Sequence, residues 1–323
     1  MKTIDVTALG EILIDFTQNG VSEQGNPLLE MNPGGAPCNV LAMLRKFDRK
    51  VAFIGKVGDD NFGHFLKQKA EKLGIGMSNL FFDEEVHTTL AFVHTGENGD
   101  RDFTFCRNPG ADMQLTEFEV KEEPIKQSKI FHFGTLSMTH ENVRKATVKA
   151  LELAKKNDCL ISFDPNIREP LWGNLEEARK QVEVGLGYCD ILKISDNEIQ
   201  WFTGEEDYSK AVKKIRENHQ IKLVLVSMGS EGSRAYYGDE MVEVAGFKNE
   251  NTIETTGAGD TFCGCVLHSI LDLGLDALTR EQLVEMLTMA NGAASLITTK
   301  KGALCSMPEI KEVTDFISSD TLS

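Results

Sequence analysis

The sequence predicts an α/β protein in which a mostly parallel sheet carries helices on both faces. Short runs of β-branched and aromatic residues recur along the 323 residues, and segments with helical spacing of apolar residues separate most of them. Strands that alternate with helices of several turns pair in parallel, because crossovers of that length place the helices on the faces of the sheet. Two glycine clusters, each followed by a helical pattern, indicate where such a sheet binds a ligand.

The expected strands are short runs bounded by Gly, Asp or Pro, which is the pattern typical of buried strands. They lie at residues 3–9, 51–57, 90–95, 130–134, 159–164, 190–194 and 222–228. The expected helices have apolar residues three or four apart among charged ones. They lie at residues 60–73, 141–156, 175–187 and 207–218.

Two stretches, 11–33 and 86–107, interrupt this alternation, since each has the pattern of short strands joined by a polar loop. The run Asp102-Phe103-Thr104-Phe105 has the period of two that a strand requires. We expect an antiparallel extension of the sheet that covers a ligand at the carboxyl edge. The chain has no internal repeat and no Pro/Ser-rich linker, so we expect one continuous domain over residues 1–323 with a small protruding sheet.

The charge balance excludes several kinds of partner. The chain has 34 Lys and Arg against 50 Asp and Glu, a net charge of −16, and no block of five or more basic residues. Such a surface repels nucleic acid and anionic membranes, so we expect neither as a partner. Asp5, Glu11 and Asp15 fall where a secretory signal needs an apolar core, and no apolar run is long enough to span a bilayer. We therefore expect the protein in the cytoplasm.

The segment ETTGAGDTF, which starts at Glu254, carries the strongest chemical signal. Small residues at the start of a helix let an anion approach free backbone N–H groups and the positive end of the helix dipole. Asp260 falls in the first turn, where a negative charge beside a phosphate is costly unless it accepts a proton from an attacking hydroxyl. For this motif by itself, an ordinary helix-terminal acid is the simpler alternative.

A second cluster, NPGGAPCN, lies at residues 32–39 and also precedes a helical pattern. Asn39 can bond a polyol hydroxyl, and Asp15, in GEILID after the first strand, can bind further hydroxyls. Each feature alone is more often a turn or a cap. The chain has neither a P-loop nor the motif set of protein kinases, so phosphate chemistry would require a different architecture.

Taken together, these segments resemble the ribokinase-like sugar kinases, also called the PfkB carbohydrate kinase family. GGAPCNV and ETTGAGDTFCG carry the likeness, which extends from GEILID near the start to TTKKGA near the end. Within the family, RDFTFCRNPGAD at 101–112 and SFDPNIREPLW at 162–172 are most similar to bacterial fructokinases. The resemblance implies a ribokinase-like fold with a small β-sheet lid.

The resemblance also implies an enzyme that uses Mg-ATP to phosphorylate the primary hydroxyl of a small sugar, with D-fructose giving fructose 6-phosphate as the first choice. 2-Keto-3-deoxygluconate kinase is the alternative, since Arg107 or Arg168 can pair with a sugar carboxylate, and ribokinase follows. A non-catalytic protein that senses a sugar or nucleotide is the alternative from another class. The exposed edge of the lid also allows a homodimer.

Individual roles follow from the resemblance. Asp260 matches the catalytic base, and the backbone of Gly257, Ala258 and Gly259 matches the anion hole. The positions that match sugar contacts are Asp15, Gly34, Gly35 and Asn39, with Arg168 at the junction of sugar and phosphate and Phe103, Phe105 and Arg107 where the lid closes. The positions that match the nucleotide and solvated Mg²⁺ are Lys193, Glu198, Ser227, Gly229, Gly232 and Asn291.

In the family's potassium-activated members, the region that matches Glu254, Thr256, Gly302 and Ser306 holds a monovalent cation. Glu254 stands where Asp is usual, so the sequence leaves open whether this protein requires K⁺. Ser195 replaces the Asn of the family's NxxE motif, and the acid of that motif, Glu198, is kept.

Overall fold

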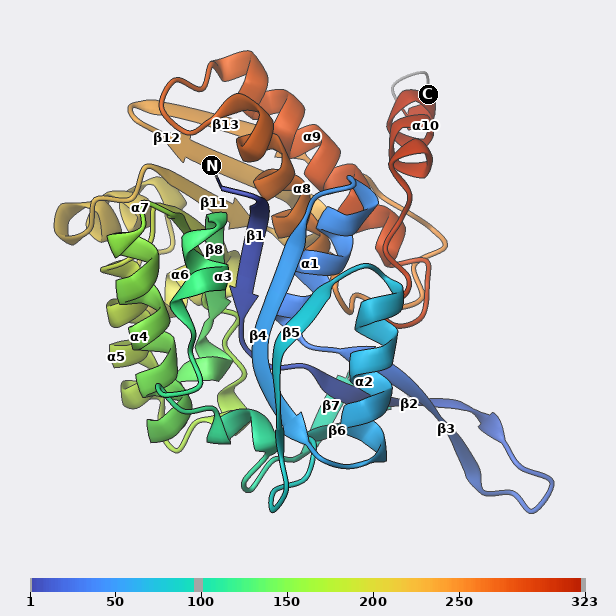
Figure 1. Cartoon of the computed structure of the whole chain (residues 1–323). Coiled ribbons are helices and arrows are strands. Elements are labelled where there is room, and N and C mark those ends of the chain that lie inside the picture. Colours follow the sequence, from blue (N-terminus) through green and yellow to red (C-terminus); the bar gives the residue numbers. More distant parts are fainter. Residues whose placement is uncertain (1, 96–100, 321–323) are drawn as a thin grey trace.

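The computed structural model describes residues 2–95 and 101–320, and in this part of the chain the strands form a large and a small sheet (Figure 1). The large sheet has the strand order β13-β12-β11-β10-β9-β8-β1-β4-β5. Its strands are β1 (Ile4–Leu9), β4 (Val51–Gly58), β5 (Gly76–Asp83), β8 (Ser128–Gly134), β9 (Leu160–Asp164), β10 (Ile191–Ser195), β11 (Leu223–Ser227), β12 (Gly232–Tyr237) and β13 (Glu240–Ala245).

The strands from β11 to β5 pair in parallel, and β12 and β13 extend one edge as an antiparallel hairpin. The predicted mostly parallel sheet is thus confirmed. Prediction from sequence missed β5, β12 and β13, which lie at or next to the two edges. Strands inside a parallel sheet are buried on both faces and form continuous apolar runs, whereas strands near an edge do not have to.

Helices cover both faces of the large sheet, as expected (Figure 1). One face packs against α1 (Ala36–Lys46), α2 (Asn61–Lys72), α8 (Ala258–Leu273), α9 (Arg280–Ile297) and α10 (Ile310–Asp320). The other packs against α3 (Glu122–Lys126), α4 (Glu141–Lys156), α5 (Leu175–Leu186), α6 (Asp196–Thr203) and α7 (Tyr208–Asn218). Each face therefore has its own apolar core, with Phe53 in one and the stacked rings of Phe133 and Phe163 in the other.

The small sheet projects from the body beyond the carboxyl ends of β1 and β5 (Figure 1). Its order is β3-β2-β6-β7, formed by β2 (Leu13–Val21), β3 (Pro27–Gly34), β6 (Leu90–Thr95) and β7 (Arg101–Cys106). The outer pairs are antiparallel as expected, but the inner pair β2–β6 is parallel. Both inner strands leave the same edge of the large sheet and run outward in the same direction, so they can pair only in parallel.

No helix in the described ranges combines the length and the apolarity that a membrane span requires.

Candidate functional site

The N-terminus of α8 is built from glycines whose small size the packing requires. Gly257 caps the helix with φ 78°, a left-handed conformation, and a Cβ there would lie 2.6 Å from the Cβ of Ala303. A Cβ on Gly259 would lie 3.0 Å from the ammonium nitrogen of Lys193. Gly257 and Gly259 line a cavity next to the positive charge of Lys193, which suits an anion, while Ala258 N already donates to Thr255 O at 3.2 Å.

Asp260 lies in this first turn and is buried. Asn39 Nδ2 donates a 2.8 Å hydrogen bond to Asp260 Oδ2. Burial raises the pKa of Asp260, while the bond from Asn39 and the positive charges of Lys193 and Arg168 act to lower it. A carboxylate with a raised pKa, held by an amide, is suited to accept a proton from a hydroxyl.

A cavity of about 330 Å³ opens in front of Asp260. It brings together residues from both glycine clusters and from the lid, which lie far apart in the sequence. The predicted site residues that line it are Asp15, Gly35, Asn39, Phe105, Arg168, Lys193, Thr256, Gly257, Gly259 and Asp260. Gly34 lies directly behind Asp15, since a Cβ on Gly34 would overlap the carboxylate.

Asp15 contributes a second carboxyl to this cavity. Burial and the nearby carboxylates of Glu254 and Asp260 raise its pKa to about 7, although Arg168 acts in the opposite direction. Polar groups of this kind at the carboxyl edge of a parallel sheet are suited to hydrogen-bond the hydroxyls of a polyol.

A second cavity, of about 440 Å³, also lies against the N-terminus of α8 and is lined there by Thr255, Ala258 and Gly259. The predicted nucleotide positions Ser227, Gly229, Gly232 and Asn291 line it. Thr255 and Gly259 line both this cavity and the one in front of Asp260, so the two meet at the first turn of α8. Two substrates bound in these cavities would meet beside Asp260.

A third hollow, of about 340 Å³, is lined by Arg168, Lys193 and Glu198. Lys193 Nζ lies 2.9 Å from Asp164 Oδ2, and both side chains are buried. Glu198 Oε2 accepts from the backbone N–H of Ser195 at 2.9 Å, and Glu198 Oε1 accepts from Ile167 N at 2.6 Å. Glu198 therefore ties the loop that carries Arg168 to the end of β10.

Two predicted site residues, Arg107 and Asn291, make structural contacts that the sequence did not indicate. The buried guanidinium of Arg107 donates to Asp112 Oδ2 at 2.9 Å and to Leu136 O at 3.0 Å and is not among the residues that line the cavity, so its role as a sugar contact stays a prediction. Asn291 lines the second cavity, but Nδ2 donates to Val244 O at 3.0 Å and Oδ1 accepts from Ser233. The side chain of Phe103 lies outside the described residues.

The region expected near a monovalent cation contains a buried carboxylate. Glu254 is 8% exposed, and its Oε1 accepts from the backbone N–H of Gly302 at 2.9 Å. Gly302 has φ 75°, and Ser306 Oγ donates to Lys301 O at 2.7 Å. The acid therefore holds the loop that follows α9 against the segment leading into α8.

Prediction from sequence missed Glu11, Asp164 and Asn166, all of which line hollows at the site. Each lies just after the carboxyl end of a strand or at it, and this position is a usable signal in parallel sheets. Asn166 also has φ 45°, which is uncommon for a residue other than glycine.

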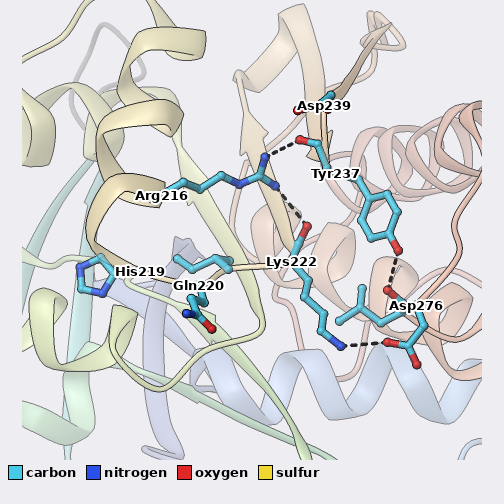
Figure 2. A pocket seen from close by; sticks show the side chains of 10 residues that line it. Arg216, His219, Gln220, Lys222, Tyr237, Asp239 and Asp276 are labelled. Atoms are coloured by element: carbon cyan, nitrogen blue, oxygen red, sulfur yellow. Dashed lines mark hydrogen bonds and ion pairs between the residues drawn. The ribbon is translucent and has the colours of Figure 1, made fainter.

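A larger hollow, of about 580 Å³, lies at the opposite edge of the sheet, where β11 begins (Figure 2). Its lining includes Arg216, Lys222 and Tyr237. These side chains bond to neighbouring backbone carbonyls or, for Lys222, to Asp276. Its size alone does not make it the functional site.

Comparisons with known proteins agree with the geometry. Residues 3–310 match the model of the pfkB family carbohydrate kinases. The chain is 40% identical over 314 residues to probable fructokinase-2 of Arabidopsis thaliana, covering 97% of this chain and 95% of the relative. Among solved structures, a fructokinase of Xylella fastidiosa with bound ATP has a TM-score of 0.90 at 26% identity, covering 99% of this chain and 100% of the other.

A fructokinase double mutant of Vibrio cholerae O395, solved with fructose, ADP and potassium ion bound, has a TM-score of 0.86 at 28% identity. The match covers 98% of this chain and 99% of the other.

Proposed function

Because the chain belongs to the pfkB family of carbohydrate kinases, we propose that it transfers the γ-phosphoryl group of ATP to the primary hydroxyl of D-fructose. The products are fructose 6-phosphate and ADP. The observation that carries this proposal is the meeting of two cavities at the first turn of α8, with Asp260 beside the junction. Fructose is the favoured sugar because relatives that are 38%, 39% and 40% identical are named fructokinases and a similar solved structure contains fructose.

In the proposed reaction, fructose lies in the 330 Å³ cavity and ATP in the 440 Å³ cavity. Asp260 accepts the proton of the primary hydroxyl as its oxygen bonds to the γ-phosphorus, and the bond from that phosphorus to the bridging oxygen of ADP breaks. The backbone N–H groups of Gly257 and Gly259 and the ammonium of Lys193 stabilise the charge on the transferring group, and Ala258 N joins them when it exchanges its bond to Thr255 O for the phosphate. Positioning and electrostatics supply most of the rate.

Mg²⁺ enters with ATP, whose phosphates it neutralises, and it needs few protein ligands because it keeps several waters. Glu198 would hold the Mg²⁺ through a bound water and not directly, because each of its carboxylate oxygens already accepts a backbone N–H, from Ile167 and from Ser195. Glu254 supplies a buried anionic charge that fits a monovalent cation site near Thr256, Gly302 and Ser306. We include K⁺ activation in the proposal, to be tested by replacing K⁺ with Na⁺.

The other candidate functions, two sugar kinases and a non-catalytic sensor, are supported by fewer observations than fructose phosphorylation. A 2-keto-3-deoxygluconate kinase needs a cation for the sugar carboxylate, and Arg107 is engaged by Asp112, so Arg168 remains as the candidate. Ribokinase activity requires the same machinery with a smaller sugar. A non-catalytic sensor would have no need of Asp260 or of the glycines at the start of α8.

The small sheet further suggests a homodimer. Val21, Leu28 and Leu29 on the β2–β3 hairpin are 59%, 49% and 48% exposed, although they are apolar. Exposed apolar strands favour pairing with a second copy. Light scattering coupled to gel filtration tests this, with a monomer at micromolar concentration as the contrary result.

The first experiment measures ADP release with Mg-ATP across fructose, 2-keto-3-deoxygluconate and ribose, each with K⁺ or Na⁺. We expect the highest kcat/KM for fructose. A preference for the keto-deoxy acid would keep the mechanism and reassign Arg168 to its carboxylate. Absence of turnover on every sugar while ATP still binds would refute the kinase assignment for this panel.

A further inference from the structure

Helix α1 begins without a side-chain cap of its own. Its N-cap residue is Gly35, with φ 117°, and no side chain at the cap bonds to the first turn. Free N–H groups at a buried helix start require a partner. Glu11, from the turn between β1 and β2, supplies one: its Oε1 accepts from Ala36 N at 2.8 Å.

Only glycine fits at position 35, because the backbone of Glu11 packs directly against it. A Cβ on Gly35 would overlap the backbone carbonyl of Glu11, and its φ also favours glycine. Because a glycine has no side chain to act as the cap, the capping carboxylate comes from another segment. Glu11 is buried, at 4% exposure, and burial raises its pKa to about 7, although the hydrogen bond from Ala36 N and the partial positive charge at the start of α1 act in favour of the carboxylate.

Asn39, which contacts the proposed base, comes directly after the first turn of α1. Asn39 N donates to Gly35 O at 2.9 Å, so Asn39 follows directly on the capped turn. Its Nδ2 donates to Asp260 Oδ2 at 2.8 Å. The location of this turn therefore sets the contact between Asn39 and the proposed base.

We propose that Glu11 is a positioning residue for phosphoryl transfer: its carboxylate holds the first turn of α1 so that Asn39 orients Asp260. This inference rests on the proposed function. Glu11 also lines the 330 Å³ cavity, but its Oε1 accepts from Ala36 N, and the proposed role is to act through α1 and not to take a proton from the sugar. Displacements of about 1 Å in a reaction centre reduce turnover by up to about 100-fold, so loss of the cap has a measurable effect on kcat.

The test is a double-mutant cycle with Glu11→Ala and Asn39→Ala, measured as kcat and KM with fructose and Mg-ATP. We expect Glu11→Ala to lower kcat by about 10- to 100-fold and to leave KM for ATP within about 2-fold. The double variant should match Asn39→Ala alone within about 2-fold, because both changes remove the same alignment. Glu11→Gln retains an acceptor oxygen and should restore most of kcat.

Asp207→Ala is the control. Asp207 caps α7 by accepting from Lys210 N at 2.8 Å, and in the described part of the chain no residue of α7 lines either cavity. Both capping variants should lower the melting temperature, but only Glu11→Ala should lower kcat. Equal losses of kcat in the two capping variants would overturn the proposal.

Two further results would also overturn it: multiplicative losses in the cycle, or a kcat for Glu11→Ala within about 2-fold of the unaltered protein. Turnover of fructose by the unaltered protein tests the proposed function separately. The ratios between variants test Glu11 with whichever sugar of the panel is turned over.

Discussion

The two ends of α8 lie beside two hollows of opposite character. Its N-terminus borders the two cavities that meet at Asp260, and its C-terminus leads to Leu275 and Asp276 in the larger hollow where β11 begins (Figure 2). There the Arg216 guanidinium donates to the carbonyls of Gly238, Tyr236 and Lys222 at 2.9, 2.8 and 3.1 Å. Lys222 Nζ bonds to Asp276 at 2.8 Å, and the Tyr237 hydroxyl donates to Leu275 O at 2.9 Å.

The N-terminal end of α8 differs from this in its buried carboxyl groups. Among the described residues, buried side-chain atoms without a hydrogen-bond partner occur at both ends: Asn39 Oδ1 and Asp164 Oδ1 at the N-terminal end, and Arg216 Nε in the larger hollow. Burial raises the pKa values of Asp15, Asp164 and Asp260. Several carboxyls with raised pKa values in one cleft indicate a functional site better than cavity volume does.

The largest effect should come from Asp260→Asn, which removes the base and keeps the shape. We expect kcat to fall by about 100- to 10,000-fold. The melting temperature should stay equal or rise, because a buried carboxylate is replaced by a neutral amide. Steady-state kinetics and thermal unfolding test both. Near-normal turnover would show that the N-terminal end of α8 does not supply the base, and the functional distinction between the two ends of the helix would be lost.

Changing the pH should move activity and stability in opposite directions. The pKa values of Glu11 and Asp15 are raised to about 7 in the folded protein from ordinary values of 4.5 and 3.8. At pH values between the ordinary and the raised pKa, the native state therefore binds more protons than the unfolded state. Stability therefore falls as pH rises through this window. Asp260, whose pKa is also raised, must lose its proton to act as a base, so kcat/KM falls as pH drops.

Unfolding temperature and kcat/KM measured from about pH 8 to about pH 6 test this expectation. We expect the first to rise and the second to fall over that interval. A parallel decline of both quantities would show that the buried carboxyls do not dominate either property.

Arg216→Ala should affect stability alone. Its guanidinium joins the end of α7 to β11 and β12 through three carbonyls, so we expect a loss of about 2 kcal/mol in the free energy of unfolding. Urea denaturation measures this loss. Both KM values should stay within about 2-fold, because the contacts lie at the edge of the sheet opposite Asp260. A changed KM for ATP would indicate that the larger hollow communicates with the site.

Lys222→Ala should have the smallest effect. The Lys222–Asp276 pair lies at the surface, with 47% and 89% of the two side chains exposed. Exposed ion pairs contribute less than about 1 kcal/mol. We expect unchanged kinetics and a small shift in the urea midpoint that disappears at high salt. A large loss of stability would make this pair part of the structural core of that edge.

The sequence predicted the interior of the fold better than its edges. β1, β10 and β11 are strands buried on both faces, and their apolar runs place them within a residue or two of the observed bounds. β5 and β13 were missed because strands at an edge can keep polar or exposed side chains. The glycine clusters were found because they are local signals at helix starts.

Arg107 shows what sequence reasoning leaves open at the site. An arginine that directly follows a lid strand is a reasonable candidate for a ligand contact. The sequence does not show, however, whether its guanidinium points into the cavity or, as observed, pairs with Asp112 on the 3-10 turn Ala111–Gln114. Glu11 shows the reverse case. An acid near the start of the chain has no local signal for capping a helix that begins 25 residues later.

The sequence by itself determined the α/β class, the two glycine-rich helix starts and the acid at the first turn of α8, because these depend on backbone conformation and periodicity over a few residues. Only the tertiary structure decided that Asn39 bonds to Asp260, that Glu11 caps α1 and that the two cavities share Gly259. These contacts join segments distant in the chain, and their geometry follows from how the strands order themselves in the sheet.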